Sequence, residues 1–276
     1  MKNTVYSCPS CGAPLVVHER SLKCSKGHSF DFAKEGYVNL LPANKKHAKD
    51  PGDDRDMVAA RTAFLDAGYY APLRDTLCGV TVNACADRSG CAVLDCGCGE
   101  GFYTARASAL CHTTIGFDAS KHAAEHGAKR ARRDGKDNLH YYTANIFDLP
   151  LKDGCADLVL NLFAPVAREE FLRILKPGGR LIVGAAGQRH LMGMKRVLYD
   201  TPYENEENNL TLEGFELLTK STVSYETVVH GQDAIRALFM MTPYYFRTSR
   251  EDAEKLYSLN ELQTEVETDF FVFRKK

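Results

Sequence analysis

Short apolar runs alternate with longer amphipathic stretches through the middle of the chain. Each run ends at a polar or glycine-rich segment, as buried strands do, and the stretches between the runs place apolar residues at helical spacing. The runs that we predict as strands cover residues 92–94, 113–117, 139–143, 156–162 and 180–185. Because strands and helices alternate regularly, the pattern predicts an α/β fold with a mostly parallel, doubly wound sheet.

The C-terminal part of the chain departs from this alternation. Its pattern predicts a strand over 215–228, helices over 234–241 and 250–259, and a last strand over 268–274. We therefore expect additional elements beyond the regular strand–helix units.

The N-terminal part divides at a polar stretch, residues 41–56, which contains Pro42 and Pro51 and has no apolar periodicity. We interpret this stretch as a linker or as a loop near the functional site. Only short strand-like runs precede it, and helical spacing follows it. The sequence thus predicts a small module over 1–40 and a large domain over 57–276.

A glycine-rich segment directly follows the first strand of the alternating region. It reads Asp95-x-Gly97-x-Gly99-x-Gly101 and leads into a helical pattern. Glycines allow positive φ angles and a close approach of the backbone to a ligand, and the first N–H groups of the helix face the crevice at the strand end. With the acid at the strand end, this spacing resembles motif I of class I S-adenosylmethionine (SAM) methyltransferases. A structural turn is the alternative, and dinucleotide enzymes use a similar loop.

Acids also follow the next two predicted strands. Asp118 ends the second strand, where an acid in this fold can bind both ribose hydroxyls, although it could instead cap the following helix in competition with Ser120. Asp148 follows the third strand and could accept a hydrogen bond from an adenine amino group or cap a turn.

The module over 1–40 contains a typical set of metal ligands. Cys8 and Cys11 form one close pair, and Cys24 and His28 form another. Three thiolates and one imidazole at this spacing suit a tetrahedral zinc ion, and a unit of about 40 residues buries too little apolar area to fold well alone. Because the set is closed, we predict a structural zinc site.

Charge is unevenly distributed along the chain. The formal net charge is -1, yet residues 1–49 carry eight basic side chains against three acidic ones, a difference of +5. A basic zinc module suits binding to the phosphates of a nucleic acid. The alternative is an ordinary solvated surface.

Composition indicates a globular protein with a full core, since 44% of the residues are hydrophobic and 26% are charged. The chain has no apolar run of membrane-spanning length and starts with polar residues, so we expect a cytoplasmic protein with no membrane partner and with reduced thiols. Outside the zinc module we expect the cysteines to act as small apolar packing residues; they are Cys78, Cys85, Cys91, Cys96, Cys98, Cys111 and Cys155.

Together, these segments resemble a known family over nearly the whole chain. The zinc ligands, the glycine-rich loop and residues 30–41, 50–53, 60–73 and 189–192 resemble the RlmA-type 23S rRNA (guanine-N1)-methyltransferases. The resemblance implies a class I (Rossmann-like) SAM methyltransferase with a small zinc-ribbon-like domain at its N-terminus. It also implies methylation of N1 of a guanine in a hairpin loop of 23S rRNA, and a homodimer. The SAM contacts that it implies are Tyr70, Gly99, Glu100, Gly101, Asp118 and His190.

The residues that we expect to act on the target base lie at the end of the fourth predicted strand. In base-modifying methyltransferases this strand end faces the base, which makes Asn161 a hydrogen-bonding candidate and Phe163 an aromatic support, with Tyr244 or Tyr245 as further aromatics. No residue is clearly placed as a proton acceptor; His190 is one candidate. Two other functions stay open: a small-molecule methyltransferase, and an RNA-binding protein without catalytic activity.

Overall fold

The computed structural model describes residues 5–42, 51–85 and 90–276. Eight strands form the main sheet in the order β10-β11-β9-β8-β5-β6-β7-β4. Strands β4 to β9 pair in parallel, whereas β11 lies antiparallel between β9 and β10, so the prediction of a mostly parallel sheet is confirmed. The strands are β4 (Val38–Asn39), β5 (Ala92–Cys96), β6 (Thr113–Asp118), β7 (Leu139–Thr143), β8 (Ala156–Leu162), β9 (Leu175–Ala186), β10 (Phe215–His230) and β11 (Glu261–Lys275).

Both faces of the central strands β5, β6 and β8 are buried, which explains the continuous apolar runs in the sequence. In β8, Leu158 and Leu160 belong to the core on one face and Val159 to the core on the other. The helices that connect or cover the strands are α1 (Arg55–Asp66), α2 (Ala71–Ala84), α3 (Phe102–Ala107), α4 (Lys121–Arg133), α5 (Arg168–Ile174), α6 (Met192–Leu198), α7 (Gln232–Met240) and α8 (Arg250–Tyr257), with a 3-10 turn at Pro243–Phe246.

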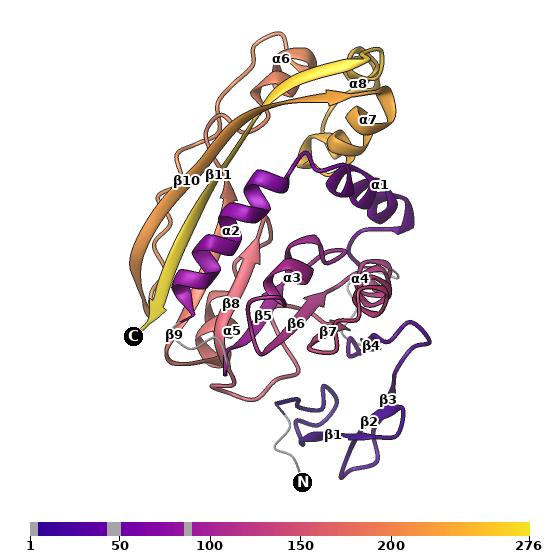
Figure 1. Cartoon of the computed structure of the whole chain (residues 1–276), viewed down its shortest axis with the longest axis vertical. Helices are drawn as coiled ribbons and strands as arrows, with labels where there is room; N and C mark the ends of the chain where they lie inside the picture. Colours follow the sequence, from indigo (N-terminus) through magenta and orange to yellow (C-terminus); the bar gives the residue numbers. More distant parts are fainter. Residues whose placement is uncertain (1–4, 43–50, 86–89) are drawn as a thin grey trace.

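The hairpin of β10 and β11 extends beyond the other strands, and α6, α7 and α8 lie at its far end (Figure 1). Strand β11 begins at Glu261, earlier than the predicted start at 268, because it pairs with β10 along its whole length. Strand β9 likewise begins at Leu175, ahead of the predicted 180. The added part of β11 is rich in polar residues, which weakens the strand pattern, so its pairing with β10 reveals it. The added part of β9 contains Pro177-Gly178-Gly179 and joins the strand through the pairing of Leu175 with Ala156.

The N-terminal module is a three-stranded antiparallel sheet of β1 (Leu15–His18), β2 (Ser21–Cys24) and β3 (Ser29–Asp31), here called the zinc ribbon. Its buried Leu15 and Leu22 belong to the same apolar core as Phe117 of the main sheet. The zinc ribbon (indigo, bottom of Figure 1) is therefore packed against the large domain rather than only tethered to it.

The transition between the two parts is more gradual than the predicted division at residue 40. Strand β4 already pairs with β7 in the main sheet, and α1 begins at Arg55, within the predicted linker. Residues 43–50, with Lys45, Lys46 and Lys49, lie outside the described residues, as does Lys2. Within the described ranges, no helix has both the length and the apolar character needed to cross a bilayer.

Candidate active site

The glycine-rich loop connects β5 to α3, and two of its glycines are required by close packing. Gly97, Gly99 and Gly101 have φ angles of 88°, 54° and 88°, a region that L side chains rarely adopt. A Cβ atom at Gly97 would lie 2.6 Å from the Cβ of Ala164, and one at Gly101 would collide with the Tyr141 side chain. The loop thus contacts Ala164, just after β8, at one glycine, and Tyr141, which packs against α4, at the other.

Asp118, at the end of β6, ties this loop to the neighbouring strand. Its carboxylate accepts hydrogen bonds from the backbone N–H groups of Gly99 (2.9 Å) and Ser120 (2.8 Å). Burial raises the pKa of Asp118, whereas these two N–H groups lower it. Ser120 is the N-cap of α4, because its hydroxyl accepts from the Ala123 N–H. The capping role considered for Asp118 therefore belongs to Ser120, and further lone pairs on Asp118 remain for a ribose.

Two more acids are buried at the loop, and each keeps one oxygen without a partner among the described residues. Asp95 accepts from the Thr104 hydroxyl (2.6 Å) through Oδ2, whereas its Oδ1 is unpartnered. Glu100 is 2% exposed, and its Oε1 is unpartnered as well. Burial raises the pKa of Asp95 to about 7, and it also raises the pKa of Glu100. Buried polar atoms of this kind normally have partners, so they indicate a site for a polar ligand.

Three aromatic rings stand in a row beside the loop. The Tyr70 hydroxyl lies 3.5 Å from His190 Nε2, and the Phe163 ring centroid lies 5.9 Å from that of His190. The Glu267 backbone N–H donates to His190 Nδ1 (3.2 Å), which places the imidazole proton on Nε2. Burial lowers the pKa of His190 to about 4, so the ring is neutral near pH 7.

Phe163 is presented in an unusual way. It is 44% exposed, and its φ angle of 52° places a bulky side chain on left-handed backbone. Such a conformation is strained for a non-glycine residue and clusters at functional sites. A hydrogen bond from the Phe163 N–H to the Gly184 carbonyl (2.9 Å) holds the backbone in place.

Asn161 is fully buried below Phe163. Its amide Nδ2 donates to the carbonyls of Cys96 (3.0 Å) and Pro165 (3.2 Å). Both amide protons are therefore used to hold the strand ends together, and Oδ1 alone lacks a partner within the described ranges. Asn161 can offer only an acceptor to a ligand.

The other predicted residues lie further out. Asp148 is exposed and lines a cavity of about 480 Å³ between the zinc ribbon and the main sheet. The turn next to it is capped by Asn145, whose Oδ1 accepts from the Phe147 N–H (3.0 Å). Tyr244 packs edge-on against Tyr199, and Tyr245 is 37% exposed.

Arg61 of α1 is a site residue that the sequence pattern did not single out. A Cβ atom at Gly99 would lie 4.0 Å from Arg61 Cδ, so the side chain lies against the loop. Arg61 lies four residues after Met57 and three before Phe64, on the inward face of α1. An arginine within this apolar spacing is the signal that could have identified it.

The predicted zinc ligands come together in the zinc ribbon. Cys11 Sγ lies 3.8 Å from Cys24 Sγ, and His28 Nδ1 lies 3.5 Å from Cys8 Sγ and 3.4 Å from Cys24 Sγ. A tetrahedral zinc ion would set sulfur–sulfur distances of about 3.8 Å and sulfur–nitrogen distances of about 3.6 Å. The four side chains therefore fit the ion.

Three of the remaining cysteines also cluster, at the opposite end of β5 from the loop. Cys85, Cys91 and Cys111 are buried with their Sγ atoms within 4.8 Å of one another. The Sγ atoms of Cys85 and Cys91 are 2.8 Å apart, whereas two thiolates on one zinc ion would be about 3.8 Å apart. Their geometry does not match that of the zinc ribbon site, and their place in the core agrees with a packing role.

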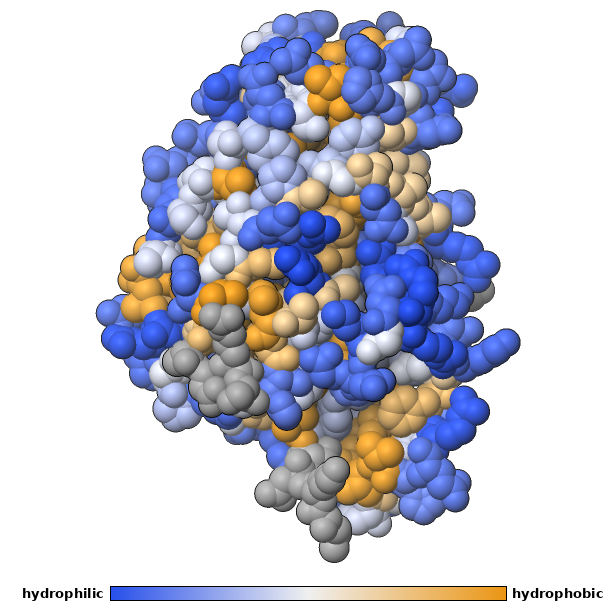
Figure 2. Space-filling model, viewed as in Figure 1, coloured by the Kyte–Doolittle hydropathy of each residue, from blue (hydrophilic) through white to orange (hydrophobic). Residues whose placement is uncertain are grey.

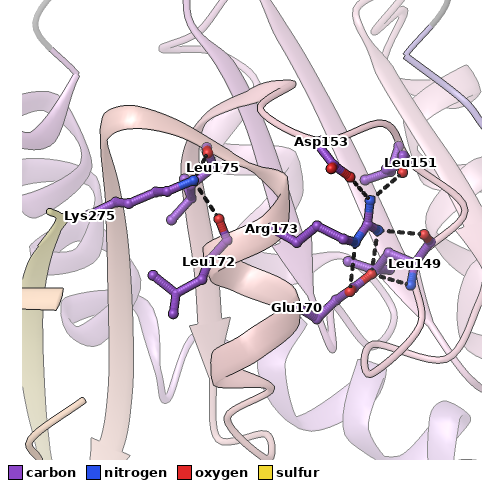
Figure 3. Close-up of polar contacts among 8 residues, drawn as sticks. All are labelled: Leu149, Leu151, Asp153, Glu170, Leu172, Arg173, Leu175 and Lys275. Atoms are coloured by element: carbon purple, nitrogen blue, oxygen red, sulfur yellow. Dashed lines mark hydrogen bonds and ion pairs between the residues drawn. The ribbon is translucent and has the colours of Figure 1, made fainter. Parts of the chain in front are cut away.

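The loop that lines the cavity is fastened by Arg173 of α5. Its guanidinium donates to the carbonyls of Leu149 (3.0 Å) and Leu151 (2.7 Å) and pairs with Asp153 and Glu170, as Figure 3 shows. The zinc ribbon's first segment then pairs with this loop, because the Ser7 N–H donates to the Pro150 carbonyl (2.9 Å). Arg173 thus holds in place the loop against which the zinc ribbon packs.

Basic side chains are exposed on the zinc ribbon and on α4. Lys23, Lys26 and Lys34 are exposed, and Arg132 of α4 donates to the Lys34 carbonyl. Hydrophilic residues gather along the side of the molecule where α4 lies (Figure 2). The zinc ribbon and α4 therefore present basic side chains on surfaces that lie next to each other.

Comparison with known proteins gives two matching family models. One is described as the N-terminal part of RlmA and matches residues 6–49; the other is described as a methyltransferase domain and matches residues 87–259. The crystal structure of the [4+2]-cyclase SpnF superposes with a TM-score of 0.50 at 20% identity, covering 73% of this chain and 80% of SpnF. That likeness shows the fold alone.

Two of the sequence relatives are named for methylation of guanine N1 in 23S rRNA, and a third, which matches a shorter part of the chain, is named for another methylation. The 23S rRNA (guanine(748)-N(1))-methyltransferase of Streptomyces fradiae is 42% identical over 195 residues, which cover 69% of this chain and 67% of the relative. YxjB of Bacillus subtilis (strain 168), a 23S rRNA (guanine-N(1)-)-methyltransferase by provisional name, is 28% identical over 295 residues and covers 100% of both chains. A demethylmenaquinone methyltransferase of Lactococcus lactis is 28% identical over 112 residues, which cover only 37% of this chain and 44% of the relative.

Proposed function

Because the chain belongs to the family of RlmA-type 23S rRNA (guanine-N1)-methyltransferases, we propose that it transfers a methyl group from SAM to N1 of a guanine in 23S rRNA. The observation that carries the proposal is Phe163, an exposed ring on strained backbone, placed beside the glycine-rich loop and His190. A small-molecule methyltransferase would share the loop but has no need of the zinc ribbon.

The cofactor would be held by the loop and by the side chains around it. Asp118 would accept from the ribose hydroxyls, whereas Glu100 and Asp95 would offer their unpartnered oxygens to the amino-acid part or to ordered water. Tyr70 and His190 would close the side next to the target base. We assign Asp148 to the adenine end or to the RNA, since it lies on the rim between the main sheet and the zinc ribbon.

When bound, SAM supplies a methyl group already activated by its sulfonium, so the protein's task is to place guanine N1 in line with it. The base must leave its stack, and the exposed Phe163 ring offers it a new face to stack on. Asn161 Oδ1 is an acceptor at the end of the same strand, which suits the N–H groups on the guanine edge.

Guanine N1 carries a proton that must be lost during transfer. His190 is a poor acceptor for it, because Nδ1 already accepts from the Glu267 N–H and Nε2 carries the ring proton. We propose that the proton leaves to water and that catalysis rests on positioning. An acid outside the cofactor site whose loss stops turnover, with cofactor and RNA still bound, would contradict this mechanism.

The substrate would be a hairpin loop of 23S rRNA, held by the zinc ribbon with its zinc bound to Cys8, Cys11, Cys24 and His28. The exposed lysines of the zinc ribbon and the basic residues of α4 support binding to phosphates. We propose a functional division into a zinc ribbon over 1–40, a linker over 41–56 and a methyltransferase domain over 57–276.

We also propose a homodimer acting in the cytoplasm, where ribosomal RNA is found. The outer edge of β10 is the end of the main sheet, and the backbone groups of an edge strand can pair with a second copy. Light scattering during size-exclusion chromatography would test the assembly, and a monomer at micromolar concentration would reject it.

The activity itself is tested with labelled SAM and 23S rRNA from a strain that lacks the modification. Label in the RNA, mapped to N1 of one guanine, is the expected result. A parallel reaction with a mixture of small-molecule acceptors serves as the control. Transfer only to those acceptors, or no transfer at all despite cofactor binding, would reject the proposal.

A further inference from the structure

Arg61 carries a buried donor that the protein itself does not use. A guanidinium has five N–H donors. One terminal nitrogen pairs with Asp53 Oδ2 at 2.5 Å, whereas Nε is buried and has no partner in the part of the chain that the structure describes. An unpaired buried donor is costly, so a ligand atom is expected next to it.

The position of Arg61 points to the kind of ligand. Its Cδ lies against Gly99, and its charge lowers the pKa values of Glu100 and Asp118, which burial raises. Two buried acids, Asp95 and Glu100, and the half-buried Asp118 surround the loop, so the anionic end of a zwitterionic cofactor needs a cation there. A planar guanidinium matches a carboxylate with two parallel hydrogen bonds.

Asp53 supplies a carboxylate to Arg61 within the protein. The segment that carries it rests on the start of α4, because the Ser120 hydroxyl donates to the Asp53 carbonyl (2.5 Å). A Cβ atom at Gly52 would lie 2.8 Å from the Ser120 nitrogen, so this contact is close.

From this arrangement we infer that Arg61 binds the α-carboxylate of the methionine part of SAM, and that this carboxylate takes the place of the Asp53 side chain. The inference rests on the proposed function and specifies its cofactor site. It also makes Asp53 a competitor: cofactor binding releases the side chain that holds the end of the linker.

Calorimetry with two ligands isolates the carboxylate. S-adenosylhomocysteine has it, and the decarboxylated compound S-adenosyl-3-thiopropylamine lacks it. The Arg61→Gln variant is expected to bind S-adenosylhomocysteine roughly 10- to 100-fold more weakly, the range for a lost charged hydrogen bond, and to bind the decarboxylated compound as the wild type does. Arg61→Lys, which keeps the charge without the planar fork, should fall between. The matched control is Arg55→Gln, an exposed arginine of the same helix, and it should change neither affinity.

The competitor role gives an opposite expectation for Asp53→Asn. This variant should bind S-adenosylhomocysteine several-fold more tightly, with no change for the decarboxylated compound. Equal losses for both ligands in Arg61→Gln would overturn the carboxylate assignment, and weaker binding by Asp53→Asn would overturn the exchange. If Arg61→Gln does not fold, Arg61→Lys alone decides, because loss of the preference for the carboxylate is measured within one variant. A wild-type protein that binds neither ligand would reject the proposed function instead.

Discussion

The residue at the end of β8 combines exposure with backbone strain. Phe163 has a φ angle of 52°, and its ring faces that of His190. Glycine would adopt this backbone freely, so the phenyl ring is kept at a cost of about 1 kcal/mol. The proposed stacking of the target base on the Phe163 ring explains why a phenyl ring is kept at this strained position.

Substitutions of Phe163 should separate this role from packing. Phe163→Ala should slow RNA methylation about 10- to 100-fold, since base–aromatic stacking contributes about 1–3 kcal/mol. Phe163→Gly should lose the same activity but be more stable than Phe163→Ala by about 1 kcal/mol, because only glycine relieves the strain. Single-turnover kinetics and urea unfolding measure the two effects. Methylation at the wild-type rate in either variant would contradict the stacking role.

His190 should make stability depend on pH in one direction. Its pKa is about 4 in the folded protein and near 6.5 when unfolded, because burial disfavours the charged form. The contribution of neutral, buried His190 to the free energy of unfolding is therefore complete above pH 6.5. It is lost as the pH falls toward 4. By pH 4.5 the loss should be about 2–3 kcal/mol. Urea unfolding of wild type and His190→Gln between pH 4.5 and 7.5 measures it, and parallel curves for the two proteins would refute the assignment.

Among the elements, the loop between β7 and β8 connects two parts of the molecule. Arg173 holds its carbonyls from one side, and the zinc ribbon pairs with it through Ser7 and Pro150 on the other. Leu149 and Leu151 of this loop are buried in the apolar core, and the guanidinium of Arg173 binds their carbonyls. Apolar packing and one guanidinium with several acceptors therefore position the loop together.

Removing that guanidinium should weaken RNA methylation without affecting the cofactor. Arg173→Gln should lower the methylation rate about 3- to 10-fold and the free energy of unfolding by about 1–2 kcal/mol, as charged hydrogen bonds are lost. Lys275→Gln is the matched control, because Lys275 also donates to two carbonyls, of Leu172 and Leu175, but not to this loop (Figure 3). Calorimetry with S-adenosylhomocysteine should show no change in either variant. The same methylation loss in both would remove the special role of Arg173.

At the scale of the whole molecule, the zinc ribbon and the large sheet share one core. Leu15 and Leu22 pack in the cluster that contains Leu94 and Phe117. Loss of the metal should therefore expose apolar surface on both parts. The proposed cofactor contacts at the glycine-rich loop and Asp118 are carried by the large domain, so they should tolerate this loss.

Zinc removal tests this separation. Cys24→Ser should unfold the zinc ribbon and abolish tight RNA binding, because metal binding and folding of so small a unit are one equilibrium. Affinity for S-adenosylhomocysteine should stay within about two-fold of wild type, since its contacts lie in the large domain. Cys155→Ser, a half-buried cysteine outside the ligand set, should retain zinc and RNA binding. Metal analysis and filter binding measure both, and undiminished RNA affinity in Cys24→Ser would contradict the role of the zinc ribbon.

The sequence by itself determined the features that depend on neighbours along the chain. Hydrophobic periodicity predicted the parallel sheet, and the spacing of Cys8, Cys11, Cys24 and His28 predicted the ligand cluster. The glycine-rich loop was equally readable, because its backbone angles and its position after a strand are local properties.

Only the tertiary structure decided the features that depend on pairing between distant segments. The early start of β11 comes from its pairing with β10, and the core shared with the zinc ribbon comes from packing across the chain. The tautomer of His190 is set by the backbone of Glu267, and the unused donor of Arg61 becomes visible only beside Gly99. Periodicity records which face of an element is buried but not which partner buries it, and the partner determines the chemistry.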